Sequence, residues 1–272
     1  MTLDASETRA AEALLAFWAS AGVDACYGDE PVNRLREAQR PRPTVVASAQ
    51  PAVVSRVSNL KPEPDVTAAV AEARRLAAQA VDLLSLTEAI AAFDLCPLKF
   101  EGARQAVFGR GNPSADVIVI GEGPGADEDV QGLPFVGKAG KLLDKMLAAA
   151  KLTDRVYITN TVYWRPPGNR EPTGAEQAIC QPFVEKAISL IKPQYLLLVG
   201  GVSTKSILKR EDGILSLRGR WFEWASTDGE MTLPALPTLH PAFLLRQPAA
   251  KKKAWGDVLT LAERLDRPDR GG

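Results

Sequence analysis

Short apolar runs alternate with amphipathic helical patterns from Cys96 onward, and this alternation restricts the possible fold more than any other feature of the chain. The runs are nearly continuous in apolar residues, which is typical of parallel strands covered on both faces. We therefore expect an α/β domain, a three-layer αβα sandwich around a central, mostly parallel four-stranded sheet. The strands are predicted at 115–120, 156–159, 194–199 and 233–238, and the helices at 137–151, 173–192, 202–209 and 249–265.

The residues before about 85 have a different character, and we interpret them as a helical N-terminal extension. Residues 6–20 favour a helix with an apolar face, and a Pro-rich stretch at about 41–64 is typical of a flexible linker. A helical pattern follows at 67–84, and Thr87 is the expected cap of a short helix that ends near Phe93. The predicted units are an extension at 1–85, an α/β domain at 86–266 and a flexible tail at 267–272.

Charge and cysteine content limit the class of protein. Lys and Arg together number 33, as do Asp and Glu, so only local charge can indicate a polyanionic partner. The three cysteines lie far apart and are odd in number, which argues against a disulfide framework. No apolar run approaches the roughly 18 residues of a membrane span, and the N-terminus lacks the basic start of a signal peptide. We expect a soluble, cytoplasmic protein.

Polar or glycine residues follow each predicted strand. Glu122 follows the first strand, Asn160 the second, Gly200–Gly201 the third and His240 the fourth. Ligands of such sheets bind beyond the carboxyl ends of the strands, so a carboxylate, an amide and an imidazole are expected to converge there. His240 is the only histidine of the chain, and imidazole suits proton chemistry near neutrality. The alternative is a hydrogen-bonded loop histidine.

The loop Gly121–Gly125 surrounds Glu122 with three glycines and a proline. Glycine allows a backbone to approach a ligand closely, but the loop has neither the Walker A nor the dinucleotide-binding spacing. With Asp127, Glu128 and Asp129, Glu122 could form an oxygen-only site for a hard cation. Alternatively, Asp127 to Asp129 cap the next helix.

Two further residues suit a flat, hydrogen-bonding ligand. Phe135 lies between Pro134 and Val136 in a glycine-flanked loop, where an aromatic ring can serve as a stacking platform or can anchor the loop to the core. Asn160 offers both a donor and an acceptor, which suits the edge of a nucleobase.

Basic residues gather near the same edge of the sheet. Arg165 and Arg170 flank a rigid Pro-Pro-Gly-Asn loop, Arg246 follows His240, and Lys251–Lys253 begin the last predicted helix. Such a cluster fits a phosphate backbone, although the lysines alone could be a solvated helix face.

These motifs together resemble the family 4 uracil-DNA glycosylases, between about Phe93 and Leu265. The resemblance implies an enzyme that flips deoxyuridine out of DNA and hydrolyses its N-glycosidic bond, which starts base excision repair. It does not cover the residues before about 85. The matching blocks, in the family's order, are Gly121–Gly125 with Glu128–Asp129, Gly132–Gly137, Ile158–Asn160, Arg165–Arg170 and Leu239–Arg246.

The resemblance also implies roles for single residues. Phe135 would stack on the flipped uracil, Asn160 would bind the edge of the base, and Gly123, where relatives often have Ala, would line the same pocket. His240 would stabilise the negative charge that develops on uracil O2. Glu122 would position or activate water, or stabilise the cationic sugar.

Further roles follow from the same resemblance. Glu128 would be a supporting catalytic carboxylate, and the Leu244–Arg246 loop would press into the duplex to hold it open. The remaining DNA contacts are expected from Arg165, Arg170, Leu245, Arg246 and Lys251.

One departure from the family concerns its [4Fe-4S] cluster, which four cysteines hold. Cys96 and Cys180 match two of these positions, whereas Phe93 and Trp164 occupy the other two. Two thiolates cannot supply the four ligands of a cubane cluster. We therefore predict a protein without this cofactor, in which the aromatic rings fill the volume of the cluster.

Other interpretations remain open at this point. The chain could be a catalytically silent or altered-specificity DNA-binding member of the superfamily, or a metal-dependent phosphohydrolase that uses Glu122, Glu128 and Asp129. The extension could bind a replication or repair protein, or pack on the α/β domain. The expected partner is uracil-containing DNA, and the expected state is a monomer without membrane attachment.

Overall fold

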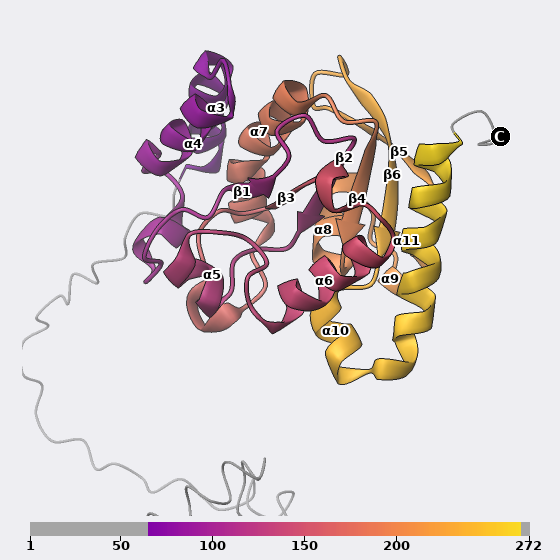
Figure 1. The fold of residues 1–272 in the computed structure, drawn as a ribbon. Coiled ribbons are helices and arrows are strands. Elements are labelled where there is room, and N and C mark those ends of the chain that lie inside the picture. The colour runs from indigo at the N-terminus through magenta and orange to yellow at the C-terminus, as the bar shows by residue number, and fades with distance from the viewer. Residues whose placement is uncertain (1–64, 268–272) are drawn as a thin grey trace, which may run out of the picture. The chain divides into compact units, whose positions relative to one another are not determined.

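The computed structural model describes residues 65–267, and a six-stranded sheet forms the centre of this part (Figure 1). The strand order is β1-β3-β2-β4-β6-β5. The four inner strands are mutually parallel, as predicted, whereas β1 and β5 pair antiparallel at the two edges. The strands are β1 Gly109–Gly111, β2 Val117–Gly121, β3 Val156–Asn160, β4 Tyr195–Val199, β5 Phe222–Ala225 and β6 Thr232–Thr238.

Helices cover both faces of the sheet, which confirms the predicted three-layer sandwich (Figure 1). Successive residues of β2 alternate between the two cores: Val117 and Val119 pack with α6 and α11, and Ile118 and Ile120 pack with α3, α4 and α7. The helices are α3 Val66–Gln79, α4 Leu83–Ala92, α5 Ala126–Gln131, α6 Lys138–Ala149, α7 Gly174–Ile191, α8 Gly201–Leu208, α9 Ile214–Leu217, α10 Pro241–Arg246 and α11 Lys251–Asp266.

The two edge strands were not predicted. β1 is only three residues long and consists of Gly109, Arg110 and Gly111, while β5 buries only Trp224. Neither has the continuous apolar run of a strand covered on both faces, so their pairing depends on the neighbouring strands rather than on a local pattern.

The helices before residue 93 differ from the prediction. The pattern at 67–84 is interrupted, because α3 ends at Gln79 and Asp82 caps α4 by accepting a hydrogen bond from the Ser85 N–H at 2.8 Å. The expected cap, Thr87, lies inside α4, and its hydroxyl donates to the Leu83 carbonyl at 2.7 Å.

The proposed division at about residue 85 runs through α4. Both α3 and α4 contribute to the core under the sheet, through side chains such as Ala73 and Leu86 that are fully buried. The described part of the sheet unit therefore includes both helices. The helix expected at 6–20 and the linker expected at 41–64 lie outside the described residues. Within residues 65–267, no helix has the length and apolar character needed to cross a membrane.

Candidate active site

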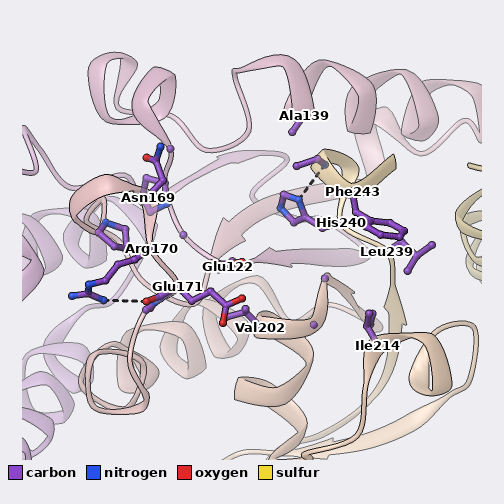
Figure 2. A pocket seen from close by; sticks show the side chains of 18 of the residues that line it. Glu122, Ala139, Asn169, Arg170, Glu171, Val202, Ile214, Leu239, His240 and Phe243 are labelled. Atoms are coloured by element: carbon purple, nitrogen blue, oxygen red, sulfur yellow. Dashed lines mark hydrogen bonds between the residues drawn. The ribbon is translucent and has the colours of Figure 1, made fainter. Parts of the chain in front are cut away.

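The loops at the carboxyl ends of the parallel strands enclose a pocket of about 910 Å³ (Figure 2). Glu122, from the loop after β2, and His240, directly after β6, both line this pocket. Gly200 and Gly201 lie at the end of β4 and form another part of the wall. The predicted convergence at this edge of the sheet is therefore confirmed for the carboxylate and the imidazole.

Phe135 is held in an unusual backbone conformation at the pocket. Its φ of 55° lies in the left-handed region, which few non-glycine residues adopt. Arg110 stabilises this turn, because its guanidinium donates to the Pro134 carbonyl at 2.7 Å and to the Phe135 carbonyl at 3.0 Å. On the other side α6 approaches so closely that a Cβ at Gly140 would overlap the Phe135 carbonyl. The ring itself lines the pocket.

Asn160 does not itself line the pocket, but its side chain meets Phe135, which does, at Gly121. A Cβ at Gly121 would come within 2.5 Å of both the Asn160 Oδ1 and the Phe135 ring, so glycine is required for the two side chains to converge. Asn160 is 1% exposed, and neither its Nδ2 nor its Oδ1 has a hydrogen-bond partner within residues 65–267. A buried, unpaired amide costs about 1–3 kcal/mol. This cost is explained if a ligand supplies the partners.

His240 is fixed as the N-cap of α10. Its Nδ1 accepts a hydrogen bond from the Ala242 N–H at 3.2 Å, the bond drawn dashed beside His240 in Figure 2. In the neutral imidazole the proton therefore resides on Nε2. Burial lowers the pKa of His240 to about 4, and the positive charge of Arg246 contributes to this lowering. At neutral pH the ring is thus an uncharged Nε2–H donor, and its centroid lies 5.8 Å from that of Phe135.

Glu122 has an environment that favours its protonated form. Burial raises the pKa of its carboxyl to about 7, and the negative charge of Glu171 adds to this effect. Both carboxylates line the pocket, and Figure 2 shows them near its centre. We had not predicted Glu171 as a site residue. The acid directly after Arg170 in the Pro-rich loop is the only sequence signal for it.

The acidic residues that follow Glu122 brace the surrounding loops. Glu128 accepts the N–H groups of Val136 and Gly137, each at 2.9 Å, and that of Gly125 at 3.1 Å. It thereby ties the glycine-rich loop to the segment that carries Phe135. Buried Asp129 accepts the Arg104 N–H at 2.8 Å.

The alternative of a hard-cation site finds no support in this arrangement. Within residues 65–267, no group of three or more His, Cys, Asp or Glu side chains is arranged to hold a metal ion.

The predicted DNA contacts fall into two groups. Arg165 donates to Asn169 Oδ1 at 2.7 Å, and Arg170 pairs with Glu176 at 2.6 Å and with Glu101 at 3.2 Å. These bonds brace the Pro-rich loop, so a phosphate contact by Arg170 would compete with an ion pair. Leu245, Arg246 and Lys251 are exposed on α10 and α11.

The segment expected to be a DNA-wedging loop is helical. Pro241 occupies the first position of α10, where proline is preferred, and His240 supplies the cap. Leu244 is fully buried beneath this helix, which leaves Leu245 and Arg246 to face solvent.

One wall of the pocket was not predicted from the sequence. It is formed by the side chains of Val202 and Lys205 from α8, and of Ile214 and Leu215 from α9. None of these residues belongs to a glycine- or proline-rich motif, so only the folded chain brings them to the site.

The four positions that correspond to the cluster ligands of the family all belong to one buried core. Phe93 and Trp164 are each 1% exposed, with ring centroids 6.4 Å apart, and Phe183 packs edge-on against Phe93 at 5.3 Å. Cys96 and Cys180 are free thiols without solvent exposure. The contact with Cys96, together with burial, raises the pKa of Cys180 well above its usual value.

Comparison with known proteins agrees with this geometry. The family model of the uracil DNA glycosylase superfamily matches residues 108–259. A type-4 uracil-DNA glycosylase of Sulfurisphaera tokodaii is 37% identical over 171 residues, which is 61% of this chain and 77% of that protein. Another, from Pyrobaculum aerophilum, is 35% identical over 183 residues, 65% of this chain and 92% of its own length.

A third relative, a type-4 uracil-DNA glycosylase of Thermotoga maritima, is 37% identical over 153 residues, 56% of this chain and 77% of the relative. The matched residues contain the sheet, the glycine-rich loop, Asn160 and His240. The chain therefore belongs to the uracil DNA glycosylase superfamily.

Proposed function

We propose that this protein is a uracil-DNA glycosylase, which flips deoxyuridine from DNA and hydrolyses the bond between uracil and the sugar. The observation that carries this proposal is the buried Asn160 amide, which has no partner within residues 65–267 and lies beside the ring of Phe135, whose centroid is 5.8 Å from that of His240. The relatives named above carry the name of the same class of enzyme, type-4 uracil-DNA glycosylase.

Asn160 supplies the recognition of the base. Uracil presents the N3–H donor beside the O4 acceptor, and an amide can accept from the first while donating to the second. Cytosine presents an acceptor and a donor at these positions, so one amide orientation favours uracil. Phe135 stacks on the face of the base, held in place by its braced backbone.

His240 assists the departure of the base. Uracil leaves as an anion, and a preorganised donor directed at its O2 stabilises the charge that develops in the transition state. A neutral imidazole suits this role, because its low pKa keeps the ring uncharged and its Nδ1 is already engaged by the Ala242 N–H. The Nε2–H is therefore the group that faces the base.

Glu122 acts on the sugar side of the bond. As a carboxylate it accepts a proton from the attacking water, or stabilises the positive charge that develops on the sugar. Since burial raises its pKa to about 7, the active carboxylate form is populated only near and above neutrality. Glu128 supports this site as a brace, with its oxygens bound by backbone N–H groups.

The experiment that tests this function uses labelled oligonucleotides with a single uracil, and matched ones with cytosine instead. The full-length protein is incubated with each in the presence of a chelator, and abasic sites are revealed by alkaline strand cleavage. We expect cleavage of the uracil strand alone. No cleavage by a folded protein that binds the DNA would contradict the proposal, and cleavage abolished by the chelator would favour a metal-dependent phosphohydrolase.

We further propose that the protein carries no [4Fe-4S] cluster. Two thiols and two aromatic rings do not fit the four-thiolate requirement. The rings of Phe93, Trp164 and Phe183 pack against one another in the same buried core as Cys96 and Cys180. The test is iron content and visible absorbance of protein purified without oxygen. A colourless protein without iron supports the proposal, and stoichiometric iron with sulfide would overturn it.

A further inference from the structure

An ion pair with a buried carboxylate contacts Thr238, the last residue of β6, two residues before His240. Asp257 of α11 is 1% exposed and receives two hydrogen bonds from Arg218, one of them from Nε to Oδ2 at 3.0 Å and the other from Nη2 to Oδ1. The same Nη2 donates to the Lys253 carbonyl at 2.6 Å. One carboxylate thus joins the turn after α9 to the first turns of α11.

Thr238 connects this ion pair to the site. Its hydroxyl donates to Asp257 Oδ2 at 2.7 Å, and it lies two residues before His240 at the end of β6. The backbone on either side is also held, because the Gly219 N–H donates to the Pro237 carbonyl and the Gly200 N–H donates to the Thr238 carbonyl, each at 2.9 Å.

Two glycines show how tightly this region is packed. Gly219 has a φ of +72°, and a Cβ there would come within 2.6 Å of Asp257 Oδ1. Gly200 has a φ of +101°, and a Cβ there would lie 3.0 Å from the His240 Cβ. The His240 side chain is therefore seated against backbone that the same hydrogen bonds hold in place.

We propose that Asp257 is a positioning residue for His240, acting through the Thr238 hydroxyl and anchored by Arg218. The inference rests on the proposed function, since it assigns a role in placing the Nε2–H donor toward the departing base. A displacement of about 1 Å in a catalytic group can cost about 100-fold in rate. A buried ion pair adds little stability compared with apolar packing, so its contact with the strand end is better explained by precision than by stability.

The first test compares two substitutions of Thr238. Thr238→Val keeps the shape of the side chain but removes the hydroxyl, whereas Thr238→Ser keeps the hydroxyl. Under single-turnover conditions with saturating protein, we expect Thr238→Val to slow uracil excision by about 10-fold without change in DNA affinity, and Thr238→Ser to retain the wild-type rate. Equal rates for wild type and Thr238→Val would overturn the proposal.

The second test reports on the position of His240 and requires no activity assay. Because the chain contains a single histidine, a ¹⁵N–¹H spectrum of the imidazole reports His240 directly. We expect Thr238→Val and Asp257→Asn to shift the ring signals and to weaken the preference for the Nε2–H tautomer. Unchanged ring signals in both variants would overturn the inference.

A matched control separates positioning from stability. Asp116 pairs with Arg155 at 2.7 Å at the opposite end of the sheet, so Asp116→Asn also breaks an ion pair. We expect it to lower the thermal midpoint without altering the His240 signals or the excision rate. If wild-type protein failed to excise uracil, the proposed function would fail, while the spectra would still test the link from Asp257 to His240.

Discussion

Asn160 and Trp164 are both buried and lie close together in the sequence, but their surroundings in the fold differ. At the end of β3, Asn160 is buried, with both amide groups unpaired within residues 65–267, and it lies beside Phe135, whose backbone is strained. Only four residues later, Trp164 is buried among aromatic rings and has no such defect. Among residues 65–267, the aromatic core has one unpaired buried group, the Tyr163 hydroxyl, whereas both the donor and the acceptor of the Asn160 amide are unpaired beside a residue that lines the pocket. This difference distinguishes a binding site from a core more clearly than burial alone.

The same contrast appears in the ionisable groups. Burial at the pocket raises the pKa of Glu122 to about 7 and lowers that of His240 to about 4, so both groups are shifted toward their neutral forms. In the aromatic core, the contact with Cys96 and burial raise the pKa of Cys180 and so favour its neutral thiol. Shifted groups that line a cavity are candidates for chemistry, whereas shifted groups enclosed by apolar side chains are not.

Asn160→Leu should have the largest effect on the excision rate, because it removes the unpaired amide that distinguishes the site from the aromatic core. Without the amide, uracil has no hydrogen-bond partner on that edge, and we expect excision to fall by about 100-fold. The same change removes an unpaired buried polar group, so the free energy of unfolding should not decrease and should rise by about 1 kcal/mol. Single-turnover excision and urea unfolding measure the two effects. A large loss of stability would contradict the inference that the Asn160 amide is unpaired in the absence of a ligand.

Glu171→Gln should change the pH dependence of excision. The negative charge of Glu171 disfavours ionisation of Glu122, so its removal should lower the pKa of Glu122 from about 7. Since the carboxylate is the active form, wild-type excision should be lost as the pH falls through about 7, and the variant should retain activity to lower pH. Rate profiles of both proteins measure this shift.

Glu223→Gln is the matched control, because this exposed residue of β5 carries the same charge and does not line the pocket. Identical profiles for wild type and Glu171→Gln would refute the coupling between the two carboxylates.

Lys251→Ala should have a smaller effect, confined to DNA binding. Loss of one phosphate contact should weaken binding a few-fold and lower the slope of log affinity against log salt by about 1. The excision rate at saturating protein should not change. Fluorescence anisotropy across a salt series measures the slope, and Arg74→Ala on α3 is the control, since this exposed residue lies outside the pocket lining. Equal slopes for wild type, Lys251→Ala and Arg74→Ala would show that Lys251 makes no contact with a DNA phosphate.

Trp164→Ala should have the smallest effect on excision, although its effect on stability is large. Removing a fully buried ring should lower the free energy of unfolding by about 3–5 kcal/mol. Molecules that remain folded should excise uracil at the wild-type rate, because the ring does not line the pocket. Calorimetry and single-turnover assays below the melting point test this. A loss of excision without a loss of stability would mean that the aromatic core takes part in the chemistry.

The sequence was sufficient where a local pattern determines the structure. The inner strands were predictable because each is a continuous apolar run. The convergence of Glu122 and His240 on one pocket was predictable because both residues follow such runs closely. Phe135 stood out because it lies in a glycine-flanked loop. Its ring both lines the pocket and belongs to the buried core beneath it, so the alternative of a loop anchored to the core also holds.

The remaining features depend on contacts between distant segments. The Gly109–Gly111 strand forms only because β3 offers a partner, and Asp82 caps α4 although Thr87 is an equally good capping residue by type. From the sequence alone, Asp257 is expected to be an exposed helix residue. In the fold it accepts hydrogen bonds from Arg218 and Thr238, which lie 39 and 19 residues earlier in the chain. Such pairs leave no local pattern in the chain.

The proposed function depends most on His240, whose neutral imidazole assists the excision of uracil at the pocket. The most direct measurement compares wild-type protein with His240→Ala on a uracil-containing oligonucleotide, under single-turnover conditions and with chelator present. We predict excision by the wild type and a loss of about 100-fold to 1,000-fold in the variant, with DNA affinity preserved. Equal excision rates in the two proteins would contradict the proposed role of His240.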